Sequence, residues 1–217
     1  MTLIKICGIT SEKVALETAA AGADFIGIVF AESPREIAPE VAQKITSALK
    51  ANITNAKSVG VFVNMSSQVL NQIAAQYGLD FVQLSGDENL EYCKSLTCPF
   101  IKAFHLSDVA SVETAMIKIQ EIQRTLLDKN VLFLLDTAAP DKYGGTGSTF
   151  NWELALPITR QHPVIIAGGL NPENVGEAIK TLQPWGVDVS SGVETNGVKD
   201  MKKIVKLIEA VRQTDAM

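Results

Sequence analysis

Eight short apolar runs recur along the chain, and longer segments with a helical pattern separate them. The runs consist almost entirely of residues such as Ile, Val, Leu and Phe, which is typical of parallel strands covered by helices. They occupy residues 3–7, 24–30, 58–63, 80–84, 99–104, 131–136, 163–167 and 187–190. The remaining segments predict helices over 11–22, 39–50, 66–76, 87–96, 108–127, 150–160, 172–182 and 199–213. This alternation restricts the chain to folds built around a parallel sheet.

Two fold classes combine a parallel sheet with helices, and the number of strands separates them. A doubly wound sheet usually has five or six strands and a glycine-rich turn early in the chain. Here eight strands are predicted, and the glycine-rich turns follow the sixth, seventh and eighth of them. No low-complexity linker divides the chain. We therefore expect an α/β fold, a closed (β/α)8 TIM barrel in which residues 1–217 form a single domain.

Composition argues against several classes of function. The 217 residues carry a formal net charge of −5 and no block of Lys or Arg, so a nucleic-acid-binding surface is not expected. No stretch reaches the roughly 18 consecutive apolar residues of a membrane helix. Lys5 and Glu12 interrupt the one early apolar run, unlike in a signal peptide. We expect a cytoplasmic protein that binds neither nucleic acid nor membranes.

The cysteines and histidines are too few for a metal site. Cys93 and Cys98 form a close pair, but no second pair and no neighbouring histidine would complete a zinc site. His105 and His162 are the only histidines of the chain. We expect no metal, and a site built from carboxylates, amides, glycines and thiols.

Residues at the carboxyl ends of the strands are the candidates for function, because the active site of a (β/α)8 barrel lies there. Cys7 ends the first predicted strand and Asp136 ends the sixth. An aspartate on so apolar a strand is costly to bury unless it serves a site or is paired. Asp136 is therefore a catalytic candidate, with a helix cap or an ion pair to Lys142 as the alternatives. Further polar or small residues at strand ends are Arg35, Asn64, Ser85, His105, Gly169, Ser190, Ser191 and Gly192.

Glycines after the seventh and eighth strands predict an anion site. Gly168 and Gly169 precede a predicted helix, and Gly192 follows Ser190 and Ser191. Glycine lets backbone amides approach a ligand closely, and a helix N-terminus adds partial positive charge. Because barrels often bind phosphate in these two loops, a phosphorylated small molecule is the expected ligand.

Another glycine cluster spans residues 142–152, after the sixth strand. It lacks the lysine that a P-loop places after its last glycine. We interpret the segment containing Gly144, Gly145 and Gly147 as a flap that closes over the ligand. An ordinary connection is the alternative, and glycine content does not separate the two.

Lys5 and Cys7 share one face of the first strand. A free cysteine is usually a small buried core residue, but a lysine on the same inward face changes that expectation. Lys5 needs a counter-charge, and Asp188 is the natural partner because the eighth strand closes the barrel beside the first. We expect a Lys5–Asp188 ion pair that supports the site, with Lys5 lowering the pKa of the Cys7 thiol from about 8.5 toward working pH. Gly8 would leave room for a substrate beside the thiol.

Short motifs in a fixed order indicate a family. They are KICGIT (5–10), GADFIGIVF (22–30), SPR (33–35), VGVFVN (59–64), VQLSG (82–86), LLDT (134–137), GGTG (144–147), AGGLNPENV (167–175) and DVSSGVE (188–194). Their order and spacing resemble the phosphoribosylanthranilate isomerase family, barrel enzymes of tryptophan biosynthesis. The resemblance covers the whole length of the chain.

The resemblance implies an Amadori rearrangement of N-(5-phosphoribosyl)anthranilate to 1-(2-carboxyphenylamino)-1-deoxyribulose 5-phosphate. It makes Cys7 the general base that removes the C2 proton, and Asp136 the general acid that opens the furanose ring. From the strand order we expect the first and sixth strands, which carry these two residues, to form opposite walls of the barrel. Arg35 is implied near the anthranilate carboxylate, and backbone amides around Gly169 and Gly192 near the phosphate. The reaction moves only protons, so the resemblance implies no cofactor.

Two positions depart from the family pattern, and two other functions stay open. Ser85 stands where the family usually has histidine, and Asn151 where it often has aspartate. A different phosphosugar isomerase, such as that of histidine biosynthesis, typically has two aspartates and a twofold internal repeat of the phosphate motif, and strands three and four lack that repeat. A non-catalytic barrel that binds a phosphorylated metabolite predicts loss of Cys7 or Asp136, yet both are present. We expect a monomer or a homodimer.

Overall fold

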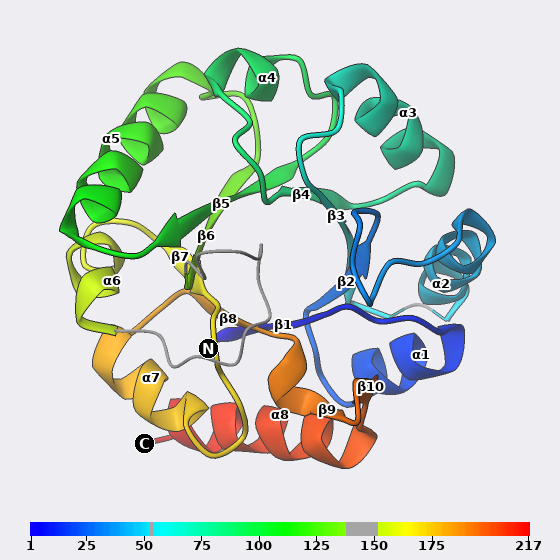
Figure 1. Cartoon of the computed structure of the whole chain (residues 1–217). Helices are drawn as coiled ribbons and strands as arrows, with labels where there is room; N and C mark the ends of the chain where they lie inside the picture. Colours follow the sequence, from blue (N-terminus) through cyan, green and yellow to red (C-terminus); the bar gives the residue numbers. More distant parts are fainter. Residues whose placement is uncertain (53, 138–151) are drawn as a thin grey trace.

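The protein is a closed barrel of eight parallel strands, surrounded by helices (Figure 1). The computed structural model describes residues 1–52, 54–137 and 152–217. The predicted flap glycines Gly144, Gly145 and Gly147 lie outside the described residues, as does Asn151. Each strand pairs with its neighbour in the chain, and β8 pairs with β1 to close the barrel. The predicted (β/α)8 fold is therefore confirmed.

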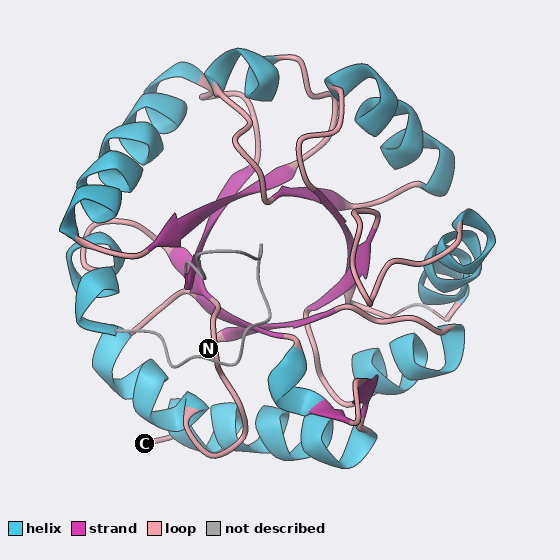
Figure 2. Cartoon of the chain, viewed as in Figure 1, coloured by secondary structure: helices cyan, strands magenta, loops and turns pink. Residues whose placement is uncertain are grey.

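The strands of the barrel lie close to the predicted ranges. They are β1 (Leu3–Cys7), β2 (Phe25–Val29), β3 (Lys57–Phe62), β4 (Phe81–Leu84), β5 (Phe100–Leu106), β6 (Val131–Thr137), β7 (Val164–Ile166) and β8 (Gly186–Val189). The helices form a ring outside them (Figure 2). They are α1 (Glu12–Ala20), α2 (Pro39–Ala51), α3 (Ser67–Tyr77), α4 (Leu90–Lys94), α5 (Val109–Thr125), α6 (Trp152–Thr159), α7 (Val175–Leu182) and α8 (Met201–Asp215).

Local capping explains where several helices begin and end. Ser11 accepts a hydrogen bond from the Val14 amide and starts α1, as predicted. Gly22 follows α1 with a φ of 107°, in the region that glycine favours. The same N-terminal capping occurs at α3, α4, α5 and α8, through Ser66, Asn89, Asp108 and Asp200.

The sequence predictions were wrong at three places. α4 is only five residues long, because Asn89 caps a helix that begins at Leu90. α7 begins at Val175, so Pro172 precedes the helix instead of lying in its first turn. Before α8, residues 191–198 were not predicted as structure and Lys199 was predicted as the start of the last helix, but they form a 3-10 turn (Ser191–Val193) and a two-stranded hairpin, β9 (Glu194–Thr195) and β10 (Val198–Lys199). Asn196 and Gly197 form its turn with φ values of 53° and 78°, the conformation that Asn-Gly favours in two-residue hairpins.

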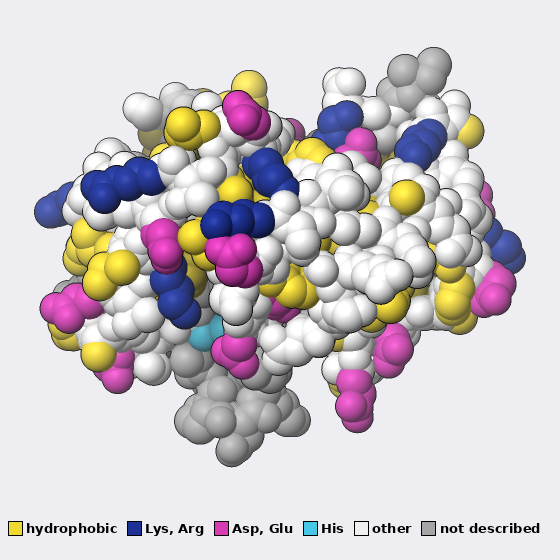
Figure 3. All heavy atoms as spheres, turned by 90° about the horizontal axis from the view of Figure 1, so that it is seen from above, with side chains coloured by type: hydrophobic (Ala, Val, Ile, Leu, Met, Phe, Trp, Pro, Cys, Tyr) yellow, Lys and Arg dark blue, Asp and Glu magenta, His cyan; other side chains and the backbone are white. Residues whose placement is uncertain are grey.

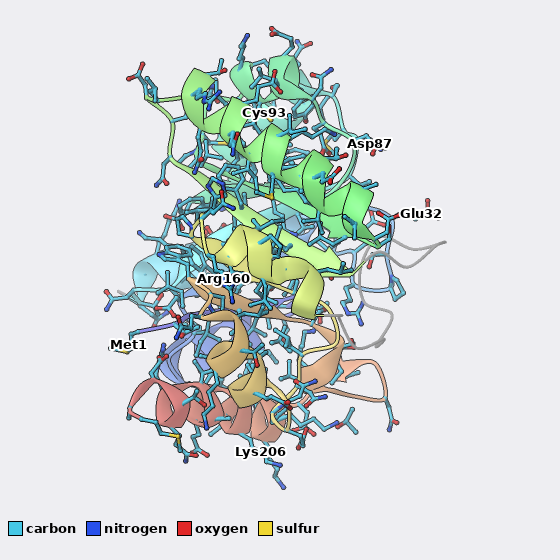
Figure 4. The ribbon with its side chains drawn as sticks, turned by 90° about the vertical axis from the view of Figure 1, so that its left-hand side faces the viewer. Met1, Glu32, Asp87, Cys93, Arg160 and Lys206 are labelled. Carbon is cyan, nitrogen blue, oxygen red and sulfur yellow. The ribbon has the colours of Figure 1, made fainter. Side chains whose placement is uncertain are left out.

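Side chains alternate between the two faces of the barrel wall. The outward residues pack with the helices into one large apolar core. The inward residues in the lower part of the barrel are apolar and form a second cluster: Phe25, Val59, Ile101, Ala103, Leu134, Ile165 and Ala167. We call the end of the barrel where the strands begin, near Met1, the lower end, and the end where they finish, near Glu32 and Asp87, the upper end. In Figure 4 Met1 lies at the left, and Glu32 and Asp87 lie at the right. Because the lower part is filled, a ligand enters the barrel from the upper end.

A buried ion pair outside the barrel wall ties the upper loops together. Lys102 of β5 donates to Glu88 at 2.8 Å and to the carbonyl oxygen of Gly86 at 2.7 Å. Glu88 also accepts hydrogen bonds from the backbone amides of Asn64 and Gly86. The pair therefore joins β5 to the loops that follow β3 and β4.

Replacing Lys102 with methionine should strongly destabilise the protein. The change leaves the Glu88 carboxylate buried without its cation, which typically costs about 3–5 kcal/mol of the free energy of unfolding. Chemical denaturation of the purified variant measures this loss. The control is Lys94→Met, which breaks an exposed pair with Glu91 and should cost at most about 1 kcal/mol. Equal losses in the two variants would contradict the buried pair's role.

Candidate active site at the upper end of the barrel

Five of the candidate residues at the strand ends point into one space. Strand alternation turns Cys7, Ser85, His105, Asp136 and Ser190 toward the barrel axis at its upper end. His105 and Asp136 are direct neighbours in the register of β5 and β6. β6 lies three strand positions from β1, so Asp136 faces Cys7 obliquely, while β5 is the strand opposite β1. The prediction that the first and sixth strands form opposite walls is corrected accordingly.

Cys7 is buried at the end of β1, with 9% of its surface exposed. It lies beside Gly27 on β2, where an added Cβ atom would come within 2.9 Å of the Cys7 Sγ. The Ser190 hydroxyl donates to the Cys7 carbonyl oxygen at 3.1 Å, which links the end of β8 to the end of β1. The thiol is therefore held between two neighbouring strands.

The predicted ion pair between Lys5 and Asp188 is present. Lys5 Nζ lies 3.0 Å from Asp188 Oδ1, and the two residues are register partners on β1 and β8. Burial opposes the charge on Lys5, but the attraction of Asp188 and Cys7 and their hydrogen bonds outweigh it and raise the Lys5 pKa. Lys5 is therefore a cation that faces the barrel interior two residues before Cys7, on the side of the thiol toward the lower end.

The expected lowering of the Cys7 pKa is wrong in direction. Burial disfavours the thiolate and raises the pKa of Cys7 above its usual value. Lys5 and Lys199 pull the pKa down and Asp188 pushes it up, but burial is the largest effect. A lysine neighbour was visible in the sequence, whereas the extent of burial depends on the closed barrel.

Arg35 reaches the site from the loop after β2. Its side chain passes over Gly8, where an added Cβ would contact the Arg35 Cδ and lie 3.3 Å from the Cγ. Gly8 has a φ of 78°, in the region that favours glycine. The expectation that Gly8 leaves room for substrate is therefore corrected, because the Arg35 side chain fills that room. The Arg35 Nε and Nη2 donate to the two carboxylate oxygens of Glu194 at 2.7 and 2.8 Å.

Glu194 and Lys199 are site residues that the sequence analysis missed. Lys199 Nζ lies 2.5 Å from Glu194 Oε1, and it also donates to the carbonyl oxygen of Ser190 at 2.9 Å. Both residues belong to the β9–β10 hairpin. The available signal was the Asn-Gly pair between Thr195 and Val198, since this pair between β-forming residues is a strong indication of a hairpin.

The two glycine loops predicted to bind phosphate lie against each other. Gly168 and Gly169 have φ values of 92° and 64°. Gly192 packs directly on the backbone of Leu170, and an added Cβ would lie 2.9 Å from the Leu170 carbonyl carbon. The Asn174 side chain donates to the Gly169 carbonyl oxygen at 3.0 Å and so holds the first loop. Gly169 and the Ser190–Gly192 segment are therefore brought together, as predicted.

Ser85 directly follows β4 and contacts one residue of β4 and one residue of β5, both of which face the barrel interior. The Gln83 amide donates to the Ser85 hydroxyl at 3.0 Å. His105 Nε2 lies 3.1 Å from the Ser85 carbonyl oxygen. An imidazole from β5 therefore lies next to Ser85, the position where the resemblance led us to expect histidine.

Outside this site, the described part of the chain has a further cavity, no metal site, no membrane-spanning helix and a face of mixed charge. A cavity of about 330 Å³ opens at the loops after β3 and β4, away from Cys7; it is lined by Asn64, Met65, Ser66, Ser67, Asp87, Glu88, Asn89 and Tyr92. Within residues 1–52, 54–137 and 152–217, no group of three or more His, Cys, Asp and Glu side chains is placed to hold a metal ion. Helices of the described part of the chain are all too short or too polar to cross a membrane. On the face in Figure 3, basic and acidic side chains are interspersed.

Comparisons with known proteins agree on one family. Residues 4–210 match the family described as PRAI, N-(5'phosphoribosyl)anthranilate (PRA) isomerase. An N-(5'-phosphoribosyl)anthranilate isomerase of Dehalococcoides mccartyi is 48% identical over 217 residues, which are 99% of this chain and 98% of that protein. The isomerase of Moorella thermoacetica is 46% identical over 216 residues, covering 99% of this chain and 92% of that protein.

Solved structures lead to the same family. A phosphoribosyl anthranilate isomerase from Thermotoga maritima has a TM-score of 0.84 and 38% identity, covering 98% of this chain and 100% of that one. A second structure of such an isomerase is in complex with reduced 1-(o-carboxyphenylamino)-1-deoxyribulose 5-phosphate; it has a TM-score of 0.81 and 36% identity, with coverage of 98% and 100%. With its barrel and its strand-end residues, the chain belongs to the N-(5'-phosphoribosyl)anthranilate isomerase family, the isomerases of tryptophan biosynthesis.

Proposed function

We propose that the enzyme rearranges N-(5'-phosphoribosyl)anthranilate with Asp136 as the general acid and Cys7 as the general base. The observation that carries this proposal is the placement of both side chains on the inner face of one barrel end, on β6 and β1. A sugar bound between them meets an acid on one side and a base on the other. Positioned proton transfer of this kind typically contributes about 10²- to 10⁴-fold in rate for each group.

The proposed steps move protons and electron pairs only. Asp136 donates its proton to the furanose ring oxygen, the bond from C1 to that oxygen breaks, and the nitrogen lone pair forms a C1=N iminium. The Cys7 thiolate then removes the C2 proton, and the C–H electron pair forms a C1=C2 double bond as the iminium electrons return to nitrogen. The enaminol takes a proton at C1 and loses the proton of its C2 hydroxyl, which gives the aminoketose.

The two ends of the substrate are proposed to bind at opposite sides of Cys7. Arg35 offers a guanidinium, which matches a carboxylate with parallel hydrogen bonds, to the anthranilate carboxylate. Backbone amides around Gly169, Ser190, Ser191 and Gly192 take the phosphate, supported by the close packing of these two loops. The ligand of the related complex, by its name, carries both a carboxyphenyl group and a 5-phosphate. Ser85 is proposed to contact the substrate between these ends.

The cellular location, the domain organisation and the oligomeric state of the enzyme are also proposals. Cys7, Cys93 and Cys98 are free thiols, and a catalytic thiol stays reduced in the cytoplasm, where we place the enzyme. We treat residues 1–217 as one domain, because the barrel begins at Leu3 and its last helix ends at Asp215. A relative from Thermotoga maritima is described as dimeric, and a monomer or a homodimer is proposed for this chain.

Complementation tests the substrate and the base together. The gene should restore growth without tryptophan to a strain that lacks this isomerase, and Cys7→Ala should not. Steady-state assays with the tryptophan-pathway and histidine-pathway aminoaldoses separate the two isomerase activities, and we expect turnover of the former. Equal growth with Cys7→Ala would contradict the assigned base, and turnover of only the histidine-pathway aminoaldose would contradict the assigned substrate.

A further inference from the structure

The β9–β10 hairpin places a buried ion pair at the mouth of the barrel that the proposed steps do not use. Glu194 and Lys199 are register partners in the hairpin, and their side chains are only 7% and 3% exposed. Charged side chains are rarely buried so completely unless they are paired or serve a site. The hairpin is small, so it adds little apolar surface that would explain it as core.

Glu194 holds two cations with one carboxylate. Its Oε1 accepts from Lys199 and from the Nε of Arg35, while its Oε2 accepts from the Nη2 of Arg35. Arg35 lies far away in the chain, in the loop after β2, so this contact joins the loops of β2 and β8 across β1. A guanidinium has a second edge, at Nη1 and Nη2, that this arrangement leaves for another anion. Glu194 therefore orients Arg35 by one edge.

Lys199 is tied to the strand end that carries the thiol. Its Nζ donates to the carbonyl oxygen of Ser190 at 2.9 Å and lies 3.3 Å from the Ser190 hydroxyl. That hydroxyl in turn donates to the carbonyl oxygen of Cys7 at 3.1 Å. Two hydrogen bonds thus connect the Lys199 ammonium to the backbone of Cys7.

Positive charges outnumber negative charges around Cys7. Lys5 from β1 and Asp188 from β8 form a neutral pair beside it, while Lys199 and Arg35 share the single carboxylate of Glu194. The second group therefore has one excess positive charge. Lys199 pulls the pKa of Cys7 down, although burial lowers the pKa of Lys199 itself. The hairpin therefore offsets part of the cost that burial imposes on the thiolate.

We propose that Glu194 and Lys199 are positioning residues of the isomerase: Glu194 fixes the direction of Arg35 toward the substrate carboxylate, and Lys199 stabilises the Cys7 thiolate. The inference rests on the proposed roles of Cys7 and Arg35. The field of Lys199 at the thiol is measurable without any turnover, so it is tested separately from those roles.

The first test measures how fast iodoacetamide alkylates Cys7 as a function of pH, by mass spectrometry of the Cys7 peptide. In Lys199→Met we expect the alkylation rate at pH 8 to fall about three- to tenfold, with the midpoint moving to higher pH, because the thiolate is the reacting form. Lys199→Arg should restore most of the rate. Lys202→Met, an exposed neighbour on α8, is the matched control and should behave as wild type. A wild-type profile in a folded Lys199→Met would overturn the role of Lys199.

The second test separates binding from chemistry with Glu194→Gln. Loss of the carboxylate frees Arg35, so we expect KM to rise about tenfold while kcat changes less than twofold. Glu209→Gln, an exposed residue on α8, is the control. An unchanged KM, or a loss confined to kcat, would overturn the role of Glu194. If the wild type did not turn over the substrate at all, the proposed function would fail, and the alkylation profile of Lys199→Met would still decide the Lys199 effect.

Discussion

Cys7→Ser is expected to lower kcat by about 10²- to 10⁴-fold while the protein still binds a substrate analogue. A serine hydroxyl is similar in size, but it stays protonated at working pH and therefore does not act as the base. The buried site beside Gly27 accommodates either side chain without a rearrangement. Steady-state kinetics measure the loss, and calorimetry with reduced 1-(o-carboxyphenylamino)-1-deoxyribulose 5-phosphate, the ligand of a related structure, measures binding.

The pH dependence of the Cys7 thiolate gives a second expected result. Burial raises the pKa of Cys7, so the fraction of the thiol present as thiolate, and with it the rate at which iodoacetamide alkylates Cys7 in the wild type, should increase with pH up to that pKa. Cys98→Ser, at a thiol away from the barrel mouth, is the control and should keep wild-type kinetics. Retention of more than a tenth of the activity in Cys7→Ser would rule out a thiolate base.

Asp136→Asn is expected to reduce kcat by about 10²- to 10⁴-fold, again with binding retained. Asparagine keeps the shape of the side chain but has no acidic proton to give to the ring oxygen. The same calorimetric and kinetic measurements apply. Together with Cys7→Ser, the result assigns the two proton transfers, because each variant is expected to lose turnover and to keep its affinity for the analogue.

The control for the acid is Asp128→Asn, an exposed aspartate before β6 that should leave the kinetics unchanged. A further distinction comes from a substrate that is already ring-opened. If Asp136 acts only in ring opening, a linear substrate analogue should be less affected by Asp136→Asn than the furanose. Full activity of Asp136→Asn on the furanose substrate would disprove the assigned acid.

Strand positions and the fold class were readable from local patterns. Each run of the barrel wall is nearly continuous in apolar residues because helices cover its outer face and packed side chains fill its lower interior. Once eight such runs are counted, alternation turns Lys5 and Cys7 inward together. The same alternation placed Asp188 beside Lys5, and the structure contains that pair.

Parts of the site depended on contacts between distant residues. Arg35 and Glu194 are 159 positions apart in the chain, and no local pattern links them. The surroundings of Gly8 also depend on a distant residue, because the Arg35 side chain fills the space that we had expected a ligand to occupy. The short hairpin that carries Glu194 and Lys199 did have a local signal in Asn196 and Gly197, but its position against the mouth did not.

By itself, the sequence determined the repeating strands and helices, the barrel they form, and the thiol, carboxylate and glycines at the strand ends. It did so because strand and helix periodicity and the location of barrel active sites are properties of short segments and their order. The tertiary structure decided how deeply Cys7 is buried and which cations face it. Those two properties set the direction of its pKa, since desolvation and charge act through space and not along the chain.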